Sequence, residues 1–251
     1  MKPGAQVLSV DENVECQAEG GVSITACFPA YNEAENLAQV VRATDDVLRS
    51  MTNRYEIIVV DDGSTDRTPT VLAELRTRYP ALQTIRQPQN TGYGAAVLTG
   101  LKAAQGDFIF FSDADNQFDI GELPMLFAEI LEADLVTGYR AIRRDPFHRR
   151  VNSFLWTALV RLALGVTVKD LNCAFKLFRR TTLERAGLEK MVSTGAAVNA
   201  ELLARLGKLN ARIREVRVSH YPRRYGRQTG GSPKVILRAF KEIIALYWRL
   251  K

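Results

Sequence analysis

Two short apolar runs, each closely followed by a pair of carboxylates, constrain the fold of this chain most strongly. Acidic pairs follow both runs: Asp61 and Asp62 after residues 57–60, and Asp113 and Asp115 after residues 108–111. Apolar runs of this length, bounded by turn residues, are typical of buried strands. In an open α/β sheet, ligands bind beyond the carboxyl ends of the strands. We therefore expect four negative charges at one sheet edge, where a cation or hydrogen-bond donors must stabilise them.

The rest of the chain alternates strand and helix patterns. Apolar runs predict strands over residues 22–28, 56–61, 82–86, 108–112 and 134–138. Between the strands, apolar residues recur at helical spacing, as in Leu37, Val40, Val41 and Leu48. This alternation predicts an α/β fold with a mainly parallel, Rossmann-like sheet and helices on both faces.

After Gly138 the regular alternation of strand and helix patterns ends. We expect helices near residues 153–164 and 199–206, a strand over 212–218 and an amphipathic helix from Pro233. The predicted organisation has three parts: a loose polar tail over 1–21, a single domain over 22–232, and a C-terminal amphipathic helix over 233–251.

Acidic and basic residues are unevenly distributed along the sequence. Residues 1–137 hold 9 Lys and Arg against 21 Asp and Glu, whereas residues 138–251 hold 25 against 7. Two surfaces with different partners produce such an asymmetry, and so do ordinary solvated helix faces. A basic half suits nucleic acid, anionic lipid or a phosphorylated substrate, and charge alone does not choose among them.

Cysteine usage and hydropathy indicate a compartment. Cys16, Cys27 and Cys173 have neither disulfide nor metal-binding spacing, which indicates a reducing compartment such as the cytoplasm. The first residues contain no apolar segment of a signal peptide. No stretch approaches the ~20 apolar residues that span a bilayer. We expect a cytoplasmic protein that is soluble or peripheral on the cytoplasmic face of a membrane.

Asp113 and Asp115 are candidate metal ligands. Two carboxylates separated by one residue lie on the same side of an extended backbone. Such a pair suits Mg²⁺ or Mn²⁺, because Mg²⁺ takes one or two protein carboxylates together with phosphate oxygens and water. Gln117 is in reach as a further oxygen ligand. The pattern is short and also arises by chance, but its place after an apolar strand favours a metal site.

Asp61 and Asp62 are candidate nucleotide ligands, since carboxylates accept hydrogen bonds from a nucleobase N–H or ribose hydroxyls. A plain turn is the alternative, because Asp, Gly and Ser all favour turns. Asp66 is expected to cap the next helix, and Asn32 with Glu35 resembles a capping box. The stretch 90–96 lacks the lysine of a P-loop, so close packing is enough to explain its glycines.

Taken together, four ordered motifs resemble those of family 2 glycosyltransferases with the GT-A fold. They are Phe28–Glu33, Val59–Asp66, Asn90–Gly94 and Asp113–Asp115. Within that family the chain looks most similar to polyprenyl- and dolichyl-phosphate mannose and glucose synthases, over about residues 23–232. The resemblance implies a metal-dependent hexosyltransferase with Mg²⁺ or Mn²⁺ as cofactor. It would move a hexose from a UDP- or GDP-hexose, with inversion, to a polyprenyl phosphate.

The resemblance also implies roles for single residues. The nucleotide is held by Pro29, Ala30, Tyr31, Glu33, Asp61, Asp62, Asp113 and Ala114. The metal is held by Asp113, Asp115 and Gln117, and the acceptor by Arg140, Arg149, Arg150 and Arg223. Arg140 also faces the donor phosphates, so the implied catalytic set is Asp113, Asp115, Arg140 and Arg223. Residues 22–138 are then the nucleotide-sugar half of the domain and residues 139–232 the acceptor half.

The sequence departs from the family pattern in places. Asn116 stands where those synthases often have an apolar residue, and the loop over 226–232 is longer and richer in glycine. The Gln-x-x-Arg-Trp block of processive synthases is missing, which argues against polymerisation. The C-terminal membrane spans of many relatives are also missing, so a separate membrane subunit is an open alternative.

The acceptor decides between the remaining alternatives. A lipid phosphate is already ionised at neutral pH and needs no general base, in line with a chain of only 2 histidines. A hydroxyl acceptor needs a base, for which Asp119 and His220 are candidates. The alternatives are therefore a soluble glycosyltransferase acting on a hydroxyl of a small molecule or sugar, and a noncatalytic nucleotide-binding module. We expect no nucleic-acid partner.

The last helix has two interpretations. Its basic residues surround an apolar stripe of Ile236, Phe240, Ile243, Ile244 and Tyr247, and Trp248 lies near its end. Such a helix lies on an anionic membrane, or it packs on the core or on a partner.

Overall fold

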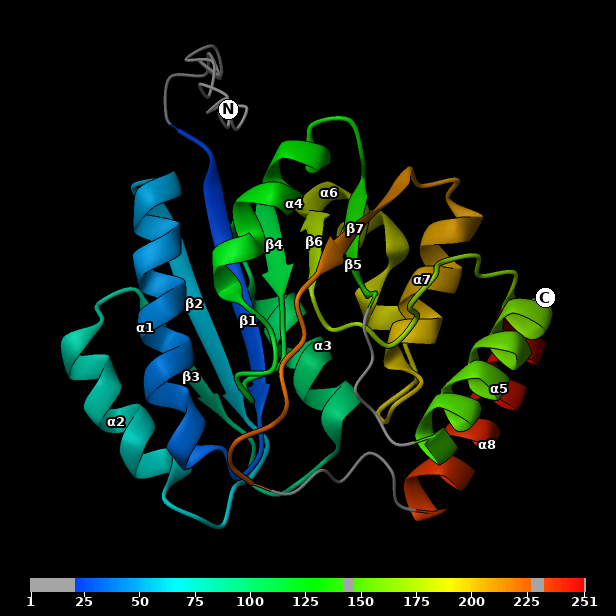
Figure 1. Cartoon of the computed structure of the whole chain (residues 1–251), viewed down its shortest axis with the longest axis horizontal. Helices are drawn as coiled ribbons and strands as arrows, with labels where there is room; N and C mark the ends of the chain where they lie inside the picture. Colours follow the sequence, from blue (N-terminus) through cyan, green and yellow to red (C-terminus); the bar gives the residue numbers. More distant parts are fainter. Residues whose placement is uncertain (1–20, 142–146, 227–232, 251) are drawn as a thin grey trace, which may run out of the picture.

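The computed structural model describes residues 21–141, 147–226 and 233–250, with side chains over 21–141, 154–226 and 238–249. Within these ranges a seven-stranded sheet has the order β3-β2-β1-β4-β6-β5-β7 (Figure 1). The strands are β1 (Ser23–Ala30), β2 (Arg54–Asp61), β3 (Leu82–Arg86), β4 (Phe108–Phe111), β5 (Leu135–Arg140), β6 (Lys176–Arg179) and β7 (Ile213–Val218). The α-helices are α1 (Ala34–Met51), α2 (Thr68–Arg78), α3 (Tyr93–Ala103), α4 (Leu123–Ile130), α5 (Phe147–Leu164), α6 (Arg180–Ala186), α7 (Val198–Lys208) and α8 (Pro233–Leu250). Residues 1–20 of the predicted tail lie outside the described residues.

The sheet is mainly parallel, as predicted. β1 pairs in parallel with β2 and β4, β2 with β3, and β5 with β7. β6 is the exception, because it runs antiparallel between β4 and β5. The sequence did not predict β6, since charged residues occupy two of its four positions, Lys176 and Arg179.

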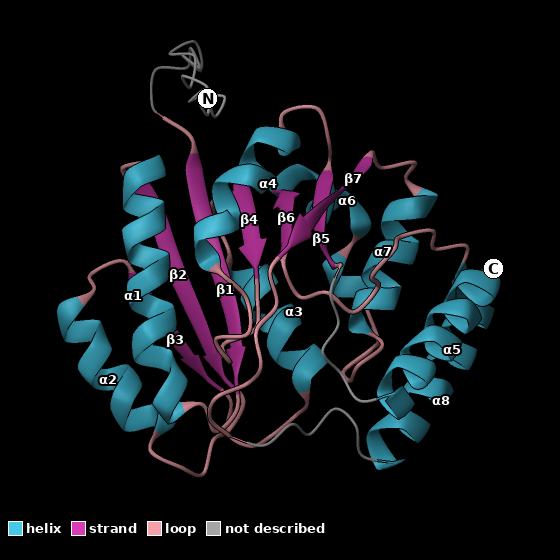
Figure 2. Ribbon diagram, in the orientation of Figure 1, coloured by secondary structure: helices cyan, strands magenta, loops and turns pink. Residues whose placement is uncertain are grey.

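Helices cover both faces of the sheet, which confirms the predicted fold class. Figure 2 shows α1 and α4 in front of the sheet and α3 and α6 behind it. α4 packs on β5, β6 and β7, whereas α3 packs on β1 and β2. Aromatic rings meet edge to face in the core, with centroids 6.3 Å apart for Phe28 and Phe110 and 4.8 Å apart for Phe110 and Phe175. These contacts fix β1, β4 and the segment before β6 relative to one another.

The start of α1 differs from the expected capping box. Asn32 has a φ of 57°, in the left-handed region that Asn tolerates better than most residues. Its Oδ1 therefore points to the next loop and accepts hydrogen bonds from the backbone N–H of Thr65, at 2.9 Å, and of Asp66, at 3.3 Å. Asp66 acts as predicted, because its Oδ1 accepts a 2.9 Å hydrogen bond from the first N–H of α2. The loops after β1 and β2 are thereby tied together.

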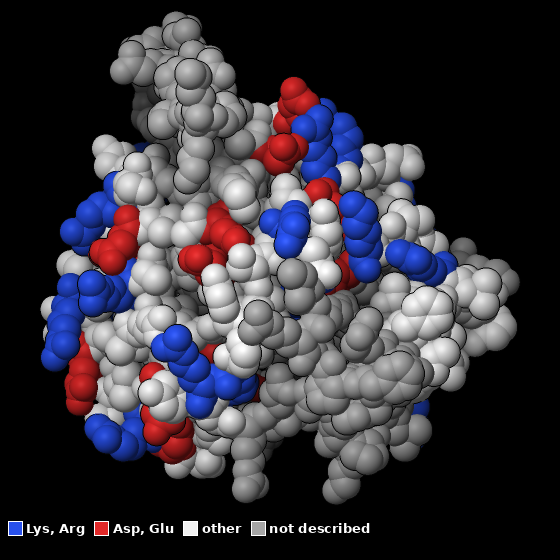
Figure 3. Space-filling model, viewed as in Figure 1, with Lys and Arg blue, Asp and Glu red and all other residues white. Residues whose placement is uncertain are grey.

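Folding neutralises part of the charge asymmetry seen in the sequence. Arg212 pairs with Asp134 at 3.3 Å, and Arg214 pairs with Glu129 at 2.6 Å and also with Glu132. Figure 3 shows blue and red side chains side by side in this region, at the top of the view. The basic strand β7 thus lies against the acidic end of α4.

α5 and α8 pack against each other at one side of the molecule (Figure 1). α8 buries Ala239, Ile243 and Leu246, and leaves Phe240, Ile244 and Trp248 exposed. The structure therefore divides the predicted stripe: Phe240 and Ile244 are exposed, Ile243 is buried and Tyr247 is half-buried, while Ile236 lies outside the described side chains. In the part of the chain that the structure describes, no helix is both long and apolar enough to cross a bilayer.

Candidate active site

The candidate site lies where the loops after β1, β2 and β4 meet the segment after β7. β1 is the shared neighbour, because Ala30 pairs with Asp61 of β2 and Cys27 pairs with Phe111 of β4. The parallel arrangement therefore brings the acidic residues of both predicted motifs to one edge of the sheet. This edge is the lower centre of Figure 1, toward which the arrowheads of β1, β2 and β4 point.

Asp113 and Asp115 follow β4 in a bend, not in the extended backbone that the sequence predicted. Tyr93, the first residue of α3, donates its hydroxyl to Asp113 Oδ1 at 2.9 Å. The backbone N–H of Gln117 donates to Asp115 Oδ1 at 3.1 Å. Withdrawal from water, together with the charge of Asp115, raises the pKa of Asp113 to about 7. Burial also raises the pKa of Asp115, and Arg223 opposes that rise.

Arg223 lies between two acidic side chains of the site. Its Nη1 is 3.3 Å from Asp115 Oδ2, and its Nη2 contacts Glu33 Oε1. Glu33 is the N-cap residue before α1, and its Oε2 accepts a 2.6 Å hydrogen bond from Asn36 Nδ2. Burial raises the pKa of Glu33, and the hydrogen bond from Asn36 and the charge of Arg223 oppose that rise. The predicted acceptor arginine is thus brought to the predicted metal carboxylates from 108 residues away in the chain.

Gln117 fastens the segment that carries Arg223. Its backbone oxygen accepts a 2.8 Å hydrogen bond from the N–H of Tyr221, and its Nε2 donates to the Tyr221 carbonyl at 2.9 Å. Next to it, Phe118 and His220 form an isolated β-bridge and an edge-to-face ring contact of 5.1 Å. Gln117 therefore has a structural role in the fold, and its role as a metal ligand stays a prediction.

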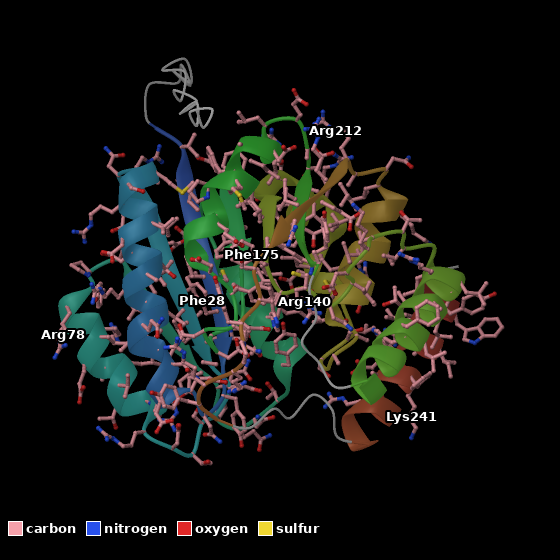
Figure 4. All side chains as sticks on the ribbon, viewed as in Figure 1. Phe28, Arg78, Arg140, Phe175, Arg212 and Lys241 are labelled. Carbon is pink, nitrogen blue, oxygen red and sulfur yellow. The ribbon has the colours of Figure 1, made fainter. Side chains whose placement is uncertain are left out.

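Arg140 is held by a residue to which the sequence assigned no role. Its Nε and Nη2 donate to the two carboxylate oxygens of Asp170 at 2.7 and 3.0 Å. Figure 4 shows Arg140, the last residue of β5, near the centre of the molecule. Its charge opposes the rise in pKa that burial causes at both Asp113 and Asp115. The predicted phosphate-facing arginine is therefore close enough to act on both carboxylates.

A second cation lies beneath this group. Lys176, in β6, is fully buried and bonds through Nζ to the carbonyl oxygen of Cys173. Burial lowers its pKa, and the nearby acidic residues Asp170 and Asp113 oppose that change. In the sequence, the signal for this pair is the presence of two charged residues, Asp170 and Lys176, within the otherwise mostly apolar stretch 170–178.

The two acidic residues after β2 have different partners. Both carboxylate oxygens of Asp62 accept hydrogen bonds from the protein. Oδ1 accepts from the N–H and hydroxyl of Thr91 at 2.8 and 3.0 Å, and Oδ2 accepts from the N–H of Gly92 at 3.0 Å. Asp61 Oδ1 accepts from the N–H of Ser64 at 2.8 Å. Asp61 Oδ2 is buried and receives no hydrogen bond within the described residues, with Arg86 Nε 3.6 Å away. A buried acceptor without a donor is unfavourable, so Asp61 Oδ2 is the better candidate for a ligand contact.

Two glycines allow the loops of the site to approach one another. Gly63 has a φ of 68°, and a Cβ there would lie 2.4 Å from the backbone of Gln89. A Cβ at Gly94 would lie 2.6 Å from the carbonyl oxygen of Gly195. The glycines of the 90–94 stretch therefore serve close packing, as predicted, with the loop before α7 as the partner. This packing also brings Tyr93 to Asp113.

The other predicted residues lie as follows. Pro29 and Ala30 end β1, Tyr31 is exposed just beyond it, and Ala114 is buried between the two acidic residues. Their nucleotide contacts stay predictions. Arg149 and Arg150 belong to α5, but their side chains lie outside the described residues. Asp119, a candidate base, accepts a 2.9 Å hydrogen bond from the N–H of Gly121 and so caps a 3₁₀ turn.

The carboxylates fit the kind of divalent cation site in which the protein supplies only some of the ligands. Among the described residues, no group of three or more His, Cys, Asp and Glu side chains is arranged to hold a metal ion. Mg²⁺, however, takes only one or two carboxylates from such a site and completes its shell with phosphate oxygens and water. Asp113 has one hydroxyl donor and a raised pKa, both of which suit a group that gains from a nearby cation.

Comparison with solved structures identifies the fold. Glucosyl-3-phosphoglycerate synthase from Mycobacterium tuberculosis, solved with Mn²⁺, UDP and glucosyl-3-phosphoglycerate, matches with a TM-score of 0.68 and 23% identity. The match covers 91% of this chain and 81% of that chain. The same enzyme with Mn²⁺, UDP-glucose and glycerol 3-phosphate gives a TM-score of 0.66. The fold is therefore that of a GT-A enzyme.

Sequence comparison gives the family. A profile described as "Glycosyl transferase family 2" matches residues 25–187, and the chain belongs to this family. Among curated relatives, the undecaprenyl-phosphate 4-deoxy-4-formamido-L-arabinose transferases of Pseudomonas paraeruginosa and Pseudomonas fluorescens are each 32% identical, over 205 and 206 residues. Each match covers 81% of this chain and 59% of the relative, so the chain spans about three fifths of their length. The resemblance seen in the motifs is confirmed.

Proposed function

We propose that this chain transfers a sugar from a nucleotide-diphosphate donor to a polyprenyl phosphate, with inversion and with a divalent cation at Asp113 and Asp115. One observation carries the proposal: two acidic residues after β4 lie within the electrostatic reach of two arginines, Arg140 and Arg223. The carboxylates of Asp113 and Asp115, which suit a cation, therefore lie near the guanidinium groups of Arg140 and Arg223, which suit phosphate.

The donor nucleotide is expected on the β1–β2 side of the site. Asp61 Oδ2 is a buried acceptor that lacks a donor among the described residues, and a nucleobase N–H can supply one. Asp62 holds the 90–94 loop and in this way shapes the same side. UDP- and GDP-sugars both carry a suitable N–H, so either base satisfies this contact.

The leaving diphosphate is expected between the acidic residues and the arginines. A bound Mg²⁺ or Mn²⁺ would supply Lewis-acid stabilisation of the leaving diphosphate. Arg140, fixed by two hydrogen bonds to Asp170, is oriented before substrate binds, and its guanidinium charge stabilises phosphate oxygens placed beside it. Preorganised donors of this kind stabilise charge without reorganising during the reaction.

A phosphate acceptor fits the chemistry of the described residues. Arg223 gives a cation for an acceptor phosphate, and such a phosphate is ionised without a general base. His220 contacts Phe118, and Asp119 caps a turn, so both base candidates already have structural roles. The names of the curated relatives specify undecaprenyl phosphate, which supports a polyprenyl phosphate here. Their sugar is a formamido-arabinose, whereas our proposal is a hexose.

The α5–α8 pair supports contact with a membrane that holds such an acceptor. Phe154 and Leu162 on α5 and Trp248 on α8 are 72%, 88% and 70% exposed. Lys241 and Arg249 are exposed on α8, and Figure 4 shows Lys241 pointing away from the body of the molecule. Figure 3 shows the exposed part of α5 as mostly uncharged surface at the right. Exposed apolar side chains flanked by cations suit the surface of an anionic bilayer.

The test of the function is a transfer assay. Purified protein is incubated with UDP- and GDP-hexoses, Mn²⁺ and either a polyprenyl phosphate or soluble hydroxyl acceptors. We expect sugar transfer to the lipid phosphate and none to the soluble acceptors. Transfer to soluble hydroxyls alone would establish the second class of glycosyltransferase. No transfer or donor hydrolysis under any condition would support a noncatalytic nucleotide-binding module.

The test of membrane contact is liposome sedimentation. We expect binding to vesicles that contain anionic lipid and weaker binding to neutral vesicles. Replacing Ile244 and Trp248 with Ser should reduce sedimentation. Replacing Leu131, an equally apolar exposed residue after α4, should leave it unchanged. Equal sedimentation of all variants would contradict this part of the proposal.

A further inference from the structure

We infer that Glu33 is a positioning residue for Arg223, and that the pair couples occupation of the cation site to release of the acceptor arginine. This inference rests on the proposed function and adds an order to it: the cation and donor bind first, and the acceptor arginine becomes available second. The resemblance assigned Glu33 to the nucleotide, which stays a prediction, and the structure adds two protein partners of its carboxylate, Asn36 and Arg223.

The guanidinium of Arg223 holds two buried carboxylates at once. The side chains of Arg223, Glu33 and Asp115 are 15%, 9% and 11% exposed. Buried charges need a counter-charge, so the arginine stabilises both acidic residues in the absence of another cation. A divalent cation bound at Asp115 needs the same carboxylate, and the two positive groups therefore compete for it.

Glu33 is held independently of Arg223. Asn36 donates to its Oε2 at 2.6 Å, and its backbone N–H donates to Thr68 Oγ1 at 2.9 Å. When a divalent cation takes Asp115, Arg223 still has Glu33 as a fixed partner. Glu33 thereby keeps the arginine at the edge of the site, while Nη1, which faced Asp115, becomes free to bind an acceptor phosphate.

The segment around Arg223 is built to hold the guanidinium in this place. Tyr221 is fixed to Gln117 by two hydrogen bonds on the upstream side. Downstream, Gly226 has a φ of 79°, and a Cβ there would lie 2.7 Å from Arg223 Nη2. The Tyr225 carbonyl accepts from Arg223 Nε at 2.6 Å. These contacts on both sides of Arg223 limit the range over which its side chain can move.

The experiment measures Mn²⁺ binding by calorimetry, without nucleotide, so its readout does not depend on turnover. Arg223→Gln removes the competing cation, and we expect Mn²⁺ to bind roughly 5- to 10-fold more tightly, the lower range of couplings between two sites. Arg224→Gln is the matched control, since Arg224 is exposed and one residue away. We expect no change in that variant. Unchanged or weaker Mn²⁺ binding in Arg223→Gln, or equal tightening in both variants, would overturn the inference.

A double-mutant cycle tests the role of Glu33. In Glu33→Gln, Arg223 pairs with Asp115 alone, and we expect weaker Mn²⁺ binding. If Glu33 acts through Arg223, the Glu33→Gln/Arg223→Gln double variant binds Mn²⁺ like Arg223→Gln alone. If Glu33 acts only by its own charge, the two effects add, and the positioning role is contradicted. Thermal unfolding checks each variant; should Glu33→Gln not fold, the comparison of Arg223→Gln with Arg224→Gln decides.

Failure of the proposed function gives a different result. If the transfer assay finds no sugar transfer but the Mn²⁺ titrations follow the pattern above, the cation-site competition holds and the enzymatic assignment is wrong. If neither the wild type nor Arg223→Gln binds Mn²⁺, the competition itself is disproved.

Discussion

Asp170 and Arg140 form a two-pronged ion pair, with Nε–Oδ2 and Nη2–Oδ1 distances of 2.7 and 3.0 Å. Only 14% of the arginine side chain and 4% of the aspartate side chain are exposed. The backbone N–H of Arg140 also lies 3.3 Å from Asp170 Oδ2. The carboxylate therefore sets the direction in which Arg140 faces the acidic residues after β4.

Replacing Asp170 with Asn should cost stability and donor binding together. Loss of one partner of a buried ion pair costs roughly 3 kcal/mol of unfolding free energy. Urea denaturation measures this loss, and donor KM should rise because Arg140 is no longer oriented. Asp46→Asn is the control, since its pair with Arg42 is 3.7 Å long and exposed, and such pairs contribute about 0.5 kcal/mol or less. Equal effects of the two substitutions would show that Arg140 is not held for function.

Tyr93→Phe should weaken Mn²⁺ binding without unfolding the chain. The hydroxyl of Tyr93 orients Asp113, and loss of such supporting hydrogen bonds typically lowers metal affinity about 10- to 100-fold. Isothermal calorimetry with Mn²⁺ and a nucleotide diphosphate measures the effect. Tyr55→Phe removes a similar hydrogen bond to Asp45, away from the site, and should leave the affinity unchanged. A normal affinity in Tyr93→Phe would mean that Asp113 needs no support.

Substitutions at Asp61 and Asp62 should have different consequences. Asp61→Asn replaces a carboxylate oxygen, an acceptor, with an amide NH₂ group, a donor. If the buried Oδ2 accepts from the nucleobase, we expect nucleotide affinity to fall roughly tenfold, the effect of losing one hydrogen bond. Asp62→Asn breaks the contacts to Thr91 and Gly92, so its main effect should be a lower melting temperature. Binding and thermal unfolding are measured on both proteins. The opposite pattern would place the nucleotide contact at Asp62.

Arg223→Ala should impair use of the acceptor far more than donor hydrolysis. The substitution removes the proposed phosphate cation and leaves Asp61 and Arg140 in place. Sugar transfer and slow hydrolysis of the donor are followed in the same reaction. If both fall equally, Arg223 belongs to the donor side of the site.

Local patterns predicted the parts of the fold that depend on local physics. The apolar runs at 57–60 and 108–111 form β2 and β4, and the parallel pairing with β1 brings their acidic ends to one edge. Strand periodicity and βαβ alternation suffice for this conclusion, because both depend on residues near in sequence. The sequence did not predict β6, because Lys176 occupies a fully buried strand position. Its neighbours in the sheet, Phe111 and Thr137, lie far away in the sequence.

The contacts between residues of the site could not be predicted from the sequence and became visible only in the structure. Glu33 and Arg223 are 190 residues apart, and no spacing rule connects them. Tyr93 reaches Asp113 because Gly94 lets α3 approach the loop before α7, a relation invisible in the 90–94 stretch alone. Asn32 looked like a capping residue, and its left-handed conformation turned it to the next loop instead. Residue types were predictable here, and their pairing was not.

The proposed function depends above all on the binding of a nucleotide-diphosphate sugar to Asp113 and Asp115 through a divalent cation. The most direct measurement is a thermal-shift panel of UDP- and GDP-sugars with and without Mn²⁺, on the wild type and on Asp115→Asn, with circular dichroism to verify folding. We expect one class of donor to raise the melting temperature of the wild type only when Mn²⁺ is present, and to have no such effect on Asp115→Asn. A shift that persists without Mn²⁺, or an equal shift in the folded variant, would contradict the account.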